Sequence, residues 1–150
     1  MDKPLKYGVH KDLHLITAGM IQYLEEKFGH GELVYFLKRV AETVYIPLVD
    51  EIRLRGLDAI ADHVAYTFSH ENGLYNCSRT EDSLQVRVTR CPAVWHLKSK
   101  GEKIPRSFCE QTRVVMHEVC KRAGCSFQIE FNTEQGTCVQ TFRMPEKMGT

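Results

Sequence analysis

The spacing of apolar residues changes near the middle of the chain, after Gly73, and this change limits the folds open to it. Before Gly73 apolar residues recur at the spacing of a helix, which places them in one stripe. The clearest stripe comprises Leu33, Phe36, Leu37, Val40 and Val44. After Gly73, Leu84, Val86 and Val88 alternate with polar residues, as in a strand with one buried face. The pattern therefore predicts helices first and antiparallel strands later.

Breaks in the helical pattern set the expected boundaries of the N-terminal helices. One helix over 11–28 stops at Gly29, and another begins after Gly56 and ends near Gly73. Pro47 interrupts the stripe between them, because proline removes a helical hydrogen bond and clashes with the preceding turn. We expect a kink or a fresh helix start at this proline.

The second half predicts two hairpins separated by helices. The first hairpin pairs 74–78 with 84–90, and the second pairs 127–131 with 137–143. The expected fold is thus α+β, with N-terminal helices packed on an antiparallel sheet of about four strands made of the two hairpins. We expect a single domain over 1–150, with loose ends at about 1–10 and 144–150.

Two helices are expected between the hairpins. Cys91-Pro92 ends the first hairpin, since proline fits the first turn of a helix, and a short helix over 93–100 follows. Ser107 is expected to cap a longer helix over 108–122, with Glu110 in the capping-box position.

Charge and apolar content exclude several classes of partner. The chain has 20 Lys and Arg against 19 Asp and Glu, so its formal charge of +1 indicates no nucleic-acid or anionic-membrane partner. No apolar stretch is long enough to span a bilayer, and the first residues lack the apolar run of a secretory signal. We therefore interpret the six cysteines as thiols of a cytoplasmic protein.

No familiar cofactor motif is present in the sequence. It lacks Gly-x-Gly-x-x-Gly, a Walker phosphate loop, a Gly-x-Ser-x-Gly elbow and a His-Glu-x-x-His pair. Residues of the types that bind zinc do occur in the second half, but no Cys-x-x-Cys pair gives them the usual spacing. We expect no cofactor, and zinc is the less favoured alternative.

The cysteines are the strongest candidates for chemistry. Cys91 and Cys109 are each expected beside a helix N-terminus, where the dipole and free amides favour a nucleophilic thiolate. The alternative for both is a buried thiol that serves as a small apolar side chain. Core filling is favoured for Cys120 and Cys125, whereas Cys138 faces Ile129 or Gln128 according to a one-residue change of register.

Short stretches of the second half resemble the L-2-amino-thiazoline-4-carboxylic acid hydrolase family. They comprise the strand end Val88-Thr89-Arg90-Cys91-Pro92, the helix start Phe108-Cys109-Glu110, and Gly136-Thr137-Cys138 with Phe142-Arg143 in the last hairpin. That family looks related in architecture to ligand-binding domains of the 4-vinyl reductase type, which implies a pocket between helices and an antiparallel sheet. Members often carry Asp and Cys where this chain has Thr112 and Gln140.

The resemblance implies hydrolytic opening of a small cyclic amidine or thiazoline carboxylate. Such a reaction requires a nucleophile or activated water, a proton donor and a cation for the substrate carboxylate. The implied nucleophile is Cys91 or Cys109, and the implied proton shuttle is Glu110 or His96. The remaining implied roles are in substrate binding, with Arg90 or Arg143 holding the carboxylate because arginine presents a planar fork of donors, and with Trp95 and Cys138 at the pocket.

Two other kinds of protein remain open from the sequence. One is a non-catalytic module that binds or senses a small molecule, in which the cysteines pack together or hold zinc. The other is a protein that acts through a partner chain, for which a homodimer through the helix over 108–122 is the simplest form. Trp95 does not help to choose between these kinds of protein, because an aromatic residue at helical spacing can either line a pocket or fill the core.

Overall fold

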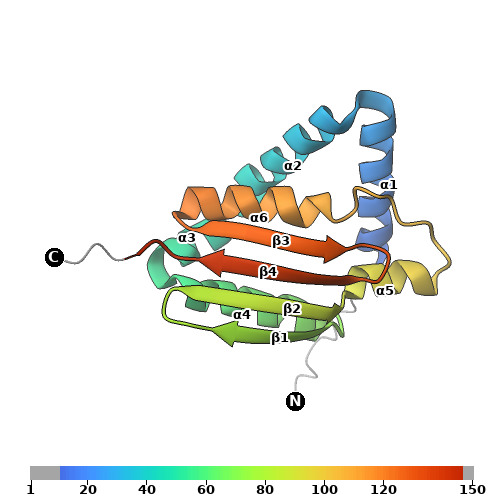
Figure 1. The fold of residues 1–150 in the computed structure, drawn as a ribbon. Helices are drawn as coiled ribbons and strands as arrows, with labels where there is room; N and C mark the ends of the chain where they lie inside the picture. The colour runs from blue at the N-terminus through green and yellow to red at the C-terminus, as the bar shows by residue number, and fades with distance from the viewer. Residues whose placement is uncertain (1–10, 147–150) are drawn as a thin grey trace, which may run out of the picture.

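The computed structural model describes residues 11–146. Helices make up the first half of the described chain: α1 (Lys11–Phe28), α2 (His30–Val44), α3 (Ile46–Arg55) and α4 (Leu57–His70). The second half contains β1 (Leu74–Arg79), β2 (Ser83–Arg90), α5 (Pro92–Ser99), α6 (Glu110–Ala123), β3 (Ser126–Asn132) and β4 (Thr137–Arg143). Figure 1 shows these elements as one sheet with helices behind and beside it.

The four strands form one antiparallel sheet in the order β1-β2-β4-β3. Each hairpin therefore stays intact, and the two hairpins join along β2 and β4, the second strand of each. The α+β fold predicted from the change in apolar spacing is confirmed. Within residues 11–146, no helix combines the length and the apolar character needed to cross a membrane.

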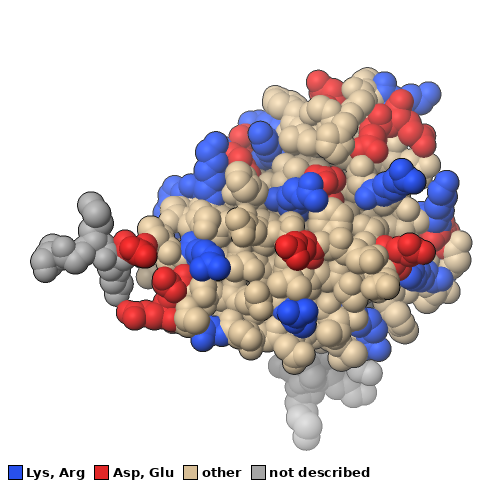
Figure 2. All heavy atoms as spheres, in the orientation of Figure 1, with Lys and Arg blue, Asp and Glu red and all other residues tan. Residues whose placement is uncertain are grey.

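The two faces of the sheet differ in their side chains. Leu84, Val86 and Val88 of β2 are buried beneath the helices, whereas the intervening residues Gln85 and Arg87 are exposed. The exposed face is turned toward the viewer in Figure 1, and Figure 2 shows acidic and basic side chains interspersed on that side of the molecule. This alternation follows from the pleat of a strand that is covered on one side only.

Pro47 produces a fresh helix start, which was one of the two expected outcomes. Helix α2 ends at Val44, Tyr45 separates the helices, and the proline occupies the first turn of α3. Proline is tolerated there because the first amides of a helix have no partner within it. Val44 is 65% exposed, so the last member of the predicted apolar stripe lies outside the core, at the end of its helix.

Ser107 does not cap α6, contrary to the prediction. Cys109 precedes the helix at the cap position, without a side-chain hydrogen bond to it. The Ser107 hydroxyl instead donates to the Glu25 carboxylate of α1 at 2.6 Å. Hydrogen bonds from His30 and from Ser107 lower the pKa of Glu25. The hydroxyl is therefore directed toward a carboxylate of a distant segment, and no side chain caps α6.

The loose ends expected at 1–10 and 144–150 lie mostly outside the described residues. Within the described part of the chain, the backbone N–H of Met144 donates to the carbonyl oxygen of Asp82 at 2.8 Å. This bond holds the chain just beyond β4 against the turn of the first hairpin.

Candidate functional site

Three junctions of the fold meet at one end of the sheet. In Figure 1 the end of β2, the β3–β4 turn and the start of α6 lie together at the right. The backbone N–H of Cys91 donates to the carbonyl oxygen of Gly136 at 2.8 Å, which joins the turn to the start of α5. Gly136 has φ +68°, and a Cβ built there would lie 3.1 Å from Cγ1 of Val94. Glycine therefore permits this close approach.

Cys91, Cys109 and Cys138 gather at these junctions, and we call them the thiol cluster. All three side chains are half-buried. Negative charge on Cys91 or on Cys138 raises the pKa of Cys109, and charge on Cys91 raises that of Cys138. The three sulfur atoms are thus close enough to influence one another electrostatically, although they come from three separate segments.

Each sulfur of the thiol cluster has hydrogen-bond donors nearby. The backbone amides of Ala93 and Val94, in the first turn of α5, lie near enough to Cys91 to lower its pKa, although its side chain forms no cap hydrogen bond. The hydroxyl of Thr133 donates to Sγ of Cys109 at 3.2 Å. Nε2 of Gln140 donates to Sγ of Cys138 at 3.5 Å. Each of these donors favours the thiolate over the thiol.

Burial nevertheless raises the pKa of every thiol in the cluster. It is the largest influence on Cys91, Cys109 and Cys138, and the pKa of Cys109 reaches about 11. Resting thiolates, which the helix N-termini were expected to favour at Cys91 and Cys109, are therefore not the main form at neutral pH. Loss of solvent around a charged sulfur outweighs the amides at the helix start.

Cys138 lies on the buried face of the sheet, where its neighbours differ from both predicted ones. It pairs with Phe131 on β3 and with Val88 on β2. The sequence predicted Ile129 or Gln128 because the exact length of the 132–136 turn sets the register. Gln140, two residues further along β4, shares its face and supplies the amide donor to its sulfur.

A histidine–glutamate group, made of His14, Glu71 and His96, adjoins the thiol cluster. Nε2 of His14 lies 3.3 Å from Oε1 of Glu71, and the rings of His14 and His96 are 6.2 Å apart. The charge of Glu71 raises the pKa of Cys91, which places this carboxylate near that sulfur. His96 is buried on α5. Sequence reasoning missed His14 and Glu71, because both precede the sheet and no local motif marks them.

Arg90 and Trp95 flank Cys91 and contact each other. The guanidinium carbon of Arg90 lies 5.2 Å from the centre of the Trp95 ring. Nη2 of Arg90 also donates to the carbonyl oxygen of Asn72 at 2.8 Å. Trp95 is 53% exposed, so it belongs to the surface beside the thiol cluster rather than to the core.

Glu110 lies beside the thiol cluster, whereas Arg143 lies at the other end of the sheet. Glu110 forms an ion pair with Arg113 at 2.9 Å, and its charge raises the pKa of Cys109. Arg143 pairs with Ser83 and Ser126 at the far ends of the neighbouring strands. The strand rise of about 3.3 Å per residue separates it from Cys138 by roughly 17 Å. The structure therefore does not bring Arg143 to the thiols.

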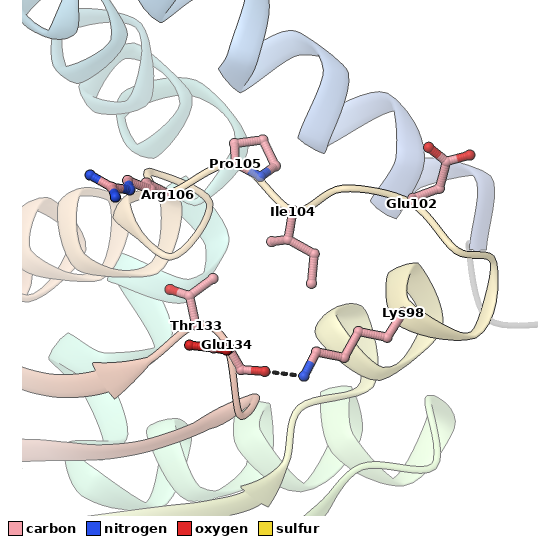
Figure 3. A pocket seen from close by; sticks show the side chains of 7 residues that line it. All are labelled: Lys98, Glu102, Ile104, Pro105, Arg106, Thr133 and Glu134. Carbon is pink, nitrogen blue, oxygen red and sulfur yellow. Dashed lines mark hydrogen bonds between the residues drawn. The ribbon is translucent and has the colours of Figure 1, made fainter.

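A cavity of about 300 Å³ adjoins the thiol cluster. Its lining comes from α5, from the loop before α6 and from the β3–β4 turn, and comprises Lys98, Glu102, Ile104, Pro105, Arg106, Thr133 and Glu134. In Figure 3, Lys98 reaches across from α5 to the backbone carbonyl of Glu134, to which its amine donates. Thr133 links the cavity to the thiol cluster, because it lines the cavity and its hydroxyl donates a hydrogen bond to Cys109.

Neither a metal site in the described part of the chain nor a known relative explains what this site does. Among residues 11–146, no group of three or more His, Cys, Asp or Glu side chains is arranged to hold a metal ion. No protein-family model matches this chain, and no curated protein matches it.

Proposed function

We propose that the protein binds a small cyclic amidine or thiazoline carboxylate beside the thiol cluster and opens its ring by hydrolysis. The main support is the convergence of Cys91, Cys109 and Cys138 from three segments, next to a cavity that Thr133 connects to them. The motif resemblance in the second half supports the same substrate class. The six free cysteines are in keeping with a cytoplasmic location.

The proposed reaction has two steps that use one water molecule. In the first, the sulfur of Cys91 attacks the carbon between the ring nitrogen and the ring sulfur, and the ring C–S bond breaks. Its electron pair goes to the ring sulfur, which takes a proton and becomes a free thiol. In the second, water attacks the same carbon and displaces Cys91. One proton of the water goes to the nitrogen that was in the ring and the other to the departing Cys91 sulfur, which leaves an N-carbamoyl thiol and the free Cys91 thiol. The oxygen of the water becomes the carbamoyl oxygen.

The environments of the thiols favour different roles for Cys91 and Cys109. Cys91 lies near the backbone amides of Ala93 and Val94, which lower its pKa and would stabilise the thiolate once its proton has been removed. Glu71 lies near that sulfur and is paired with His14, so we assign it as the proton acceptor. Cys109, with a pKa of about 11, holds its proton at neutral pH and would donate it to the departing ring sulfur.

We propose that two cations of the cavity lining hold the substrate carboxylate. Lys98 and Arg106 both line the cavity, on the side of the cluster opposite to Arg143. We therefore assign carboxylate binding to these residues in place of Arg143. The guanidinium of Arg106 offers the planar, two-donor contact that a carboxylate prefers.

A non-catalytic module that binds the same class of ligand is the second candidate. The observation that favours it is the raised pKa of all three thiols, since a resting thiolate is scarce at neutral pH. In that case the cysteines would form part of a binding wall without reacting.

Direct turnover distinguishes the two candidates. Purified protein is incubated with L-2-amino-thiazoline-4-carboxylate, and the N-carbamoyl thiol is quantified by mass spectrometry. Hydrolysis is supported if the wild type forms this product, Cys91→Ala abolishes its formation and Cys77→Ala leaves the rate unchanged. Cys77 is the matched control because it is exposed on β1. Saturable binding without product identifies a binding module, and the absence of both refutes the proposal.

A further inference from the structure

Cys120 and Cys125 form a separate pair of thiols at the C-terminal end of α6, away from the thiol cluster. Gly124, with φ 86° and ψ 25°, ends this helix in the left-handed conformation. The backbone N–H groups of Gly124 and Cys125 both donate to the carbonyl oxygen of Cys120, the latter at 2.9 Å. In such a helix ending, the side chain just beyond the glycine commonly packs on one from the last turn. Here both positions are cysteine.

The two thiols lie close enough to interact with each other. The interaction lowers the pKa of Cys125 and raises that of Cys120. Cys120 is fully buried in the core, whereas Cys125 is half-buried after the exposed Gly124. The pair therefore combines a partly exposed thiol, Cys125, with a buried thiol, Cys120.

We propose that Cys120 and Cys125 form a reversible disulfide when the protein meets a hydroperoxide. The helix ending holds the two side chains together in the folded protein, so formation of the bond requires no rearrangement of distant segments. This site lies outside the thiol cluster and is independent of the function proposed for that cluster.

The chemistry balances with the peroxide as the oxidant. The Cys125 thiolate attacks one peroxide oxygen, the O–O bond breaks, and the other oxygen leaves as water or an alcohol after taking a proton. Cys125 is then a sulfenic acid. The Cys120 sulfur attacks the Cys125 sulfur, and the hydroxyl group leaves as water with the proton of Cys120. Two thiols lose two electrons to the peroxide, and a dithiol reductant reverses the change.

The other described cysteines are less suited to this reaction. Burial raises the pKa values of the three thiols in the cluster, and it also raises the pKa of Cys77. Cys125 is the one described cysteine whose pKa is lowered. Because the thiolate is the form that reacts with peroxide, oxidation is expected to begin there.

Peptide mapping of the oxidised wild-type protein tests the proposal without any variant. The native protein is treated with one equivalent of hydrogen peroxide, remaining thiols are alkylated in denaturant, and tryptic peptides are analysed without reduction. Cleavage separates the peptide 114–121, with Cys120, from the peptide 123–143, with Cys125 and Cys138. Fragmentation of the linked peptides identifies which cysteine is joined.

The expected first product is a 120–125 link that dithiothreitol removes. A first disulfide between any other cysteines, or oxidation elsewhere while Cys120 and Cys125 stay reduced, overturns the proposal. Cys125→Ser should slow the loss of thiols at least tenfold, whereas Cys77→Ser should leave the 120–125 link unchanged. In Cys120→Ala, the oxidation of Cys125 should stop at a sulfenic acid that dimedone traps.

Discussion

The backbone N–H of Cys91 and the carbonyl oxygen of Gly136 are joined by a hydrogen bond of 2.8 Å, and this bond places the last hairpin turn on the first turn of α5. It brings Cys91 next to the segment that carries Thr133 and Cys138. The arrangement of the thiol cluster therefore depends on a glycine that contributes no side chain.

Gly136→Ala is expected to lower the free energy of unfolding by more than Gly101→Ala does. Both glycines have φ +68°, but a new Cβ meets Val94 at position 136 and nothing within 4 Å at position 101. The added crowding should cost roughly 1–3 kcal/mol beyond the shared backbone strain. Chemical denaturation of the two variants measures this difference, and equal losses would show that Val94 moves aside without cost.

Alkylation of the thiol cluster is expected to depend strongly on pH. Iodoacetamide reacts with the thiolate, so a raised pKa lowers the reactive fraction at any pH below it. For Cys109 labelling should increase by about tenfold per pH unit from neutral pH and level off near pH 11. Cys125, whose pKa is lowered, should reach its plateau at lower pH than the cluster. Mass analysis of labelled peptides reads both profiles, and a plateau for Cys109 near pH 8 would contradict its raised pKa.

Thr133→Val is expected to raise the pKa of Cys109 further. The hydroxyl donates to Sγ of Cys109 at 3.2 Å, and this bond favours the thiolate. Valine keeps the branched shape without the donor, so alkylation of Cys109 at a fixed pH near 9 should slow severalfold. Thr133→Ser retains the hydroxyl and serves as the matched control. An unchanged rate in the valine variant would mean that the hydrogen bond has no effect on this thiol.

Glu71→Gln should affect alkylation of Cys91 and turnover in opposite directions. The carboxylate raises the pKa of Cys91, so its neutralisation should speed alkylation of Cys91 near pH 9. If Glu71 also accepts the proton of Cys91 during hydrolysis, the same variant should lose most of its turnover. His14→Gln tests the partner of Glu71 at 3.3 Å. A variant that gains alkylation rate while keeping full turnover would exclude Glu71 as the base.

Most of the fold could be predicted from local sequence patterns. The predicted end of α1 at Phe28 is observed, and Gly29, Pro47 and Gly56 marked where helices end or begin. These signals act within a few residues, so they are visible without the tertiary structure. The role of Ser107 could not be predicted locally, because its hydroxyl donates a hydrogen bond to Glu25 of α1, which is distant in the sequence.

The candidate site was predictable only in part, for the same physical reason. Cysteines at two junctions were visible as candidates, but their burial, which sets the direction of their pKa shifts, depends on the packed structure. His14, Glu71 and Thr133 reach the thiol cluster through long-range packing that no short motif records. Core filling, which the sequence favoured for Cys120 and Cys125, is confirmed for Cys120, and Cys125 packs against the core. Their interaction with each other follows from the left-handed Gly124, which the sequence did not reveal.

Protection of the cysteines by a ligand tests the location of the site most directly. The wild-type protein is alkylated near pH 9 with and without a saturating concentration of L-2-amino-thiazoline-4-carboxylate, and each cysteine is quantified by mass spectrometry. A ligand seated beside the thiol cluster should slow labelling of Cys91 and Cys109 severalfold while Cys77 and Cys125 react as before. Equal labelling of Cys91 and Cys109 with and without the compound would contradict a binding site at these thiols.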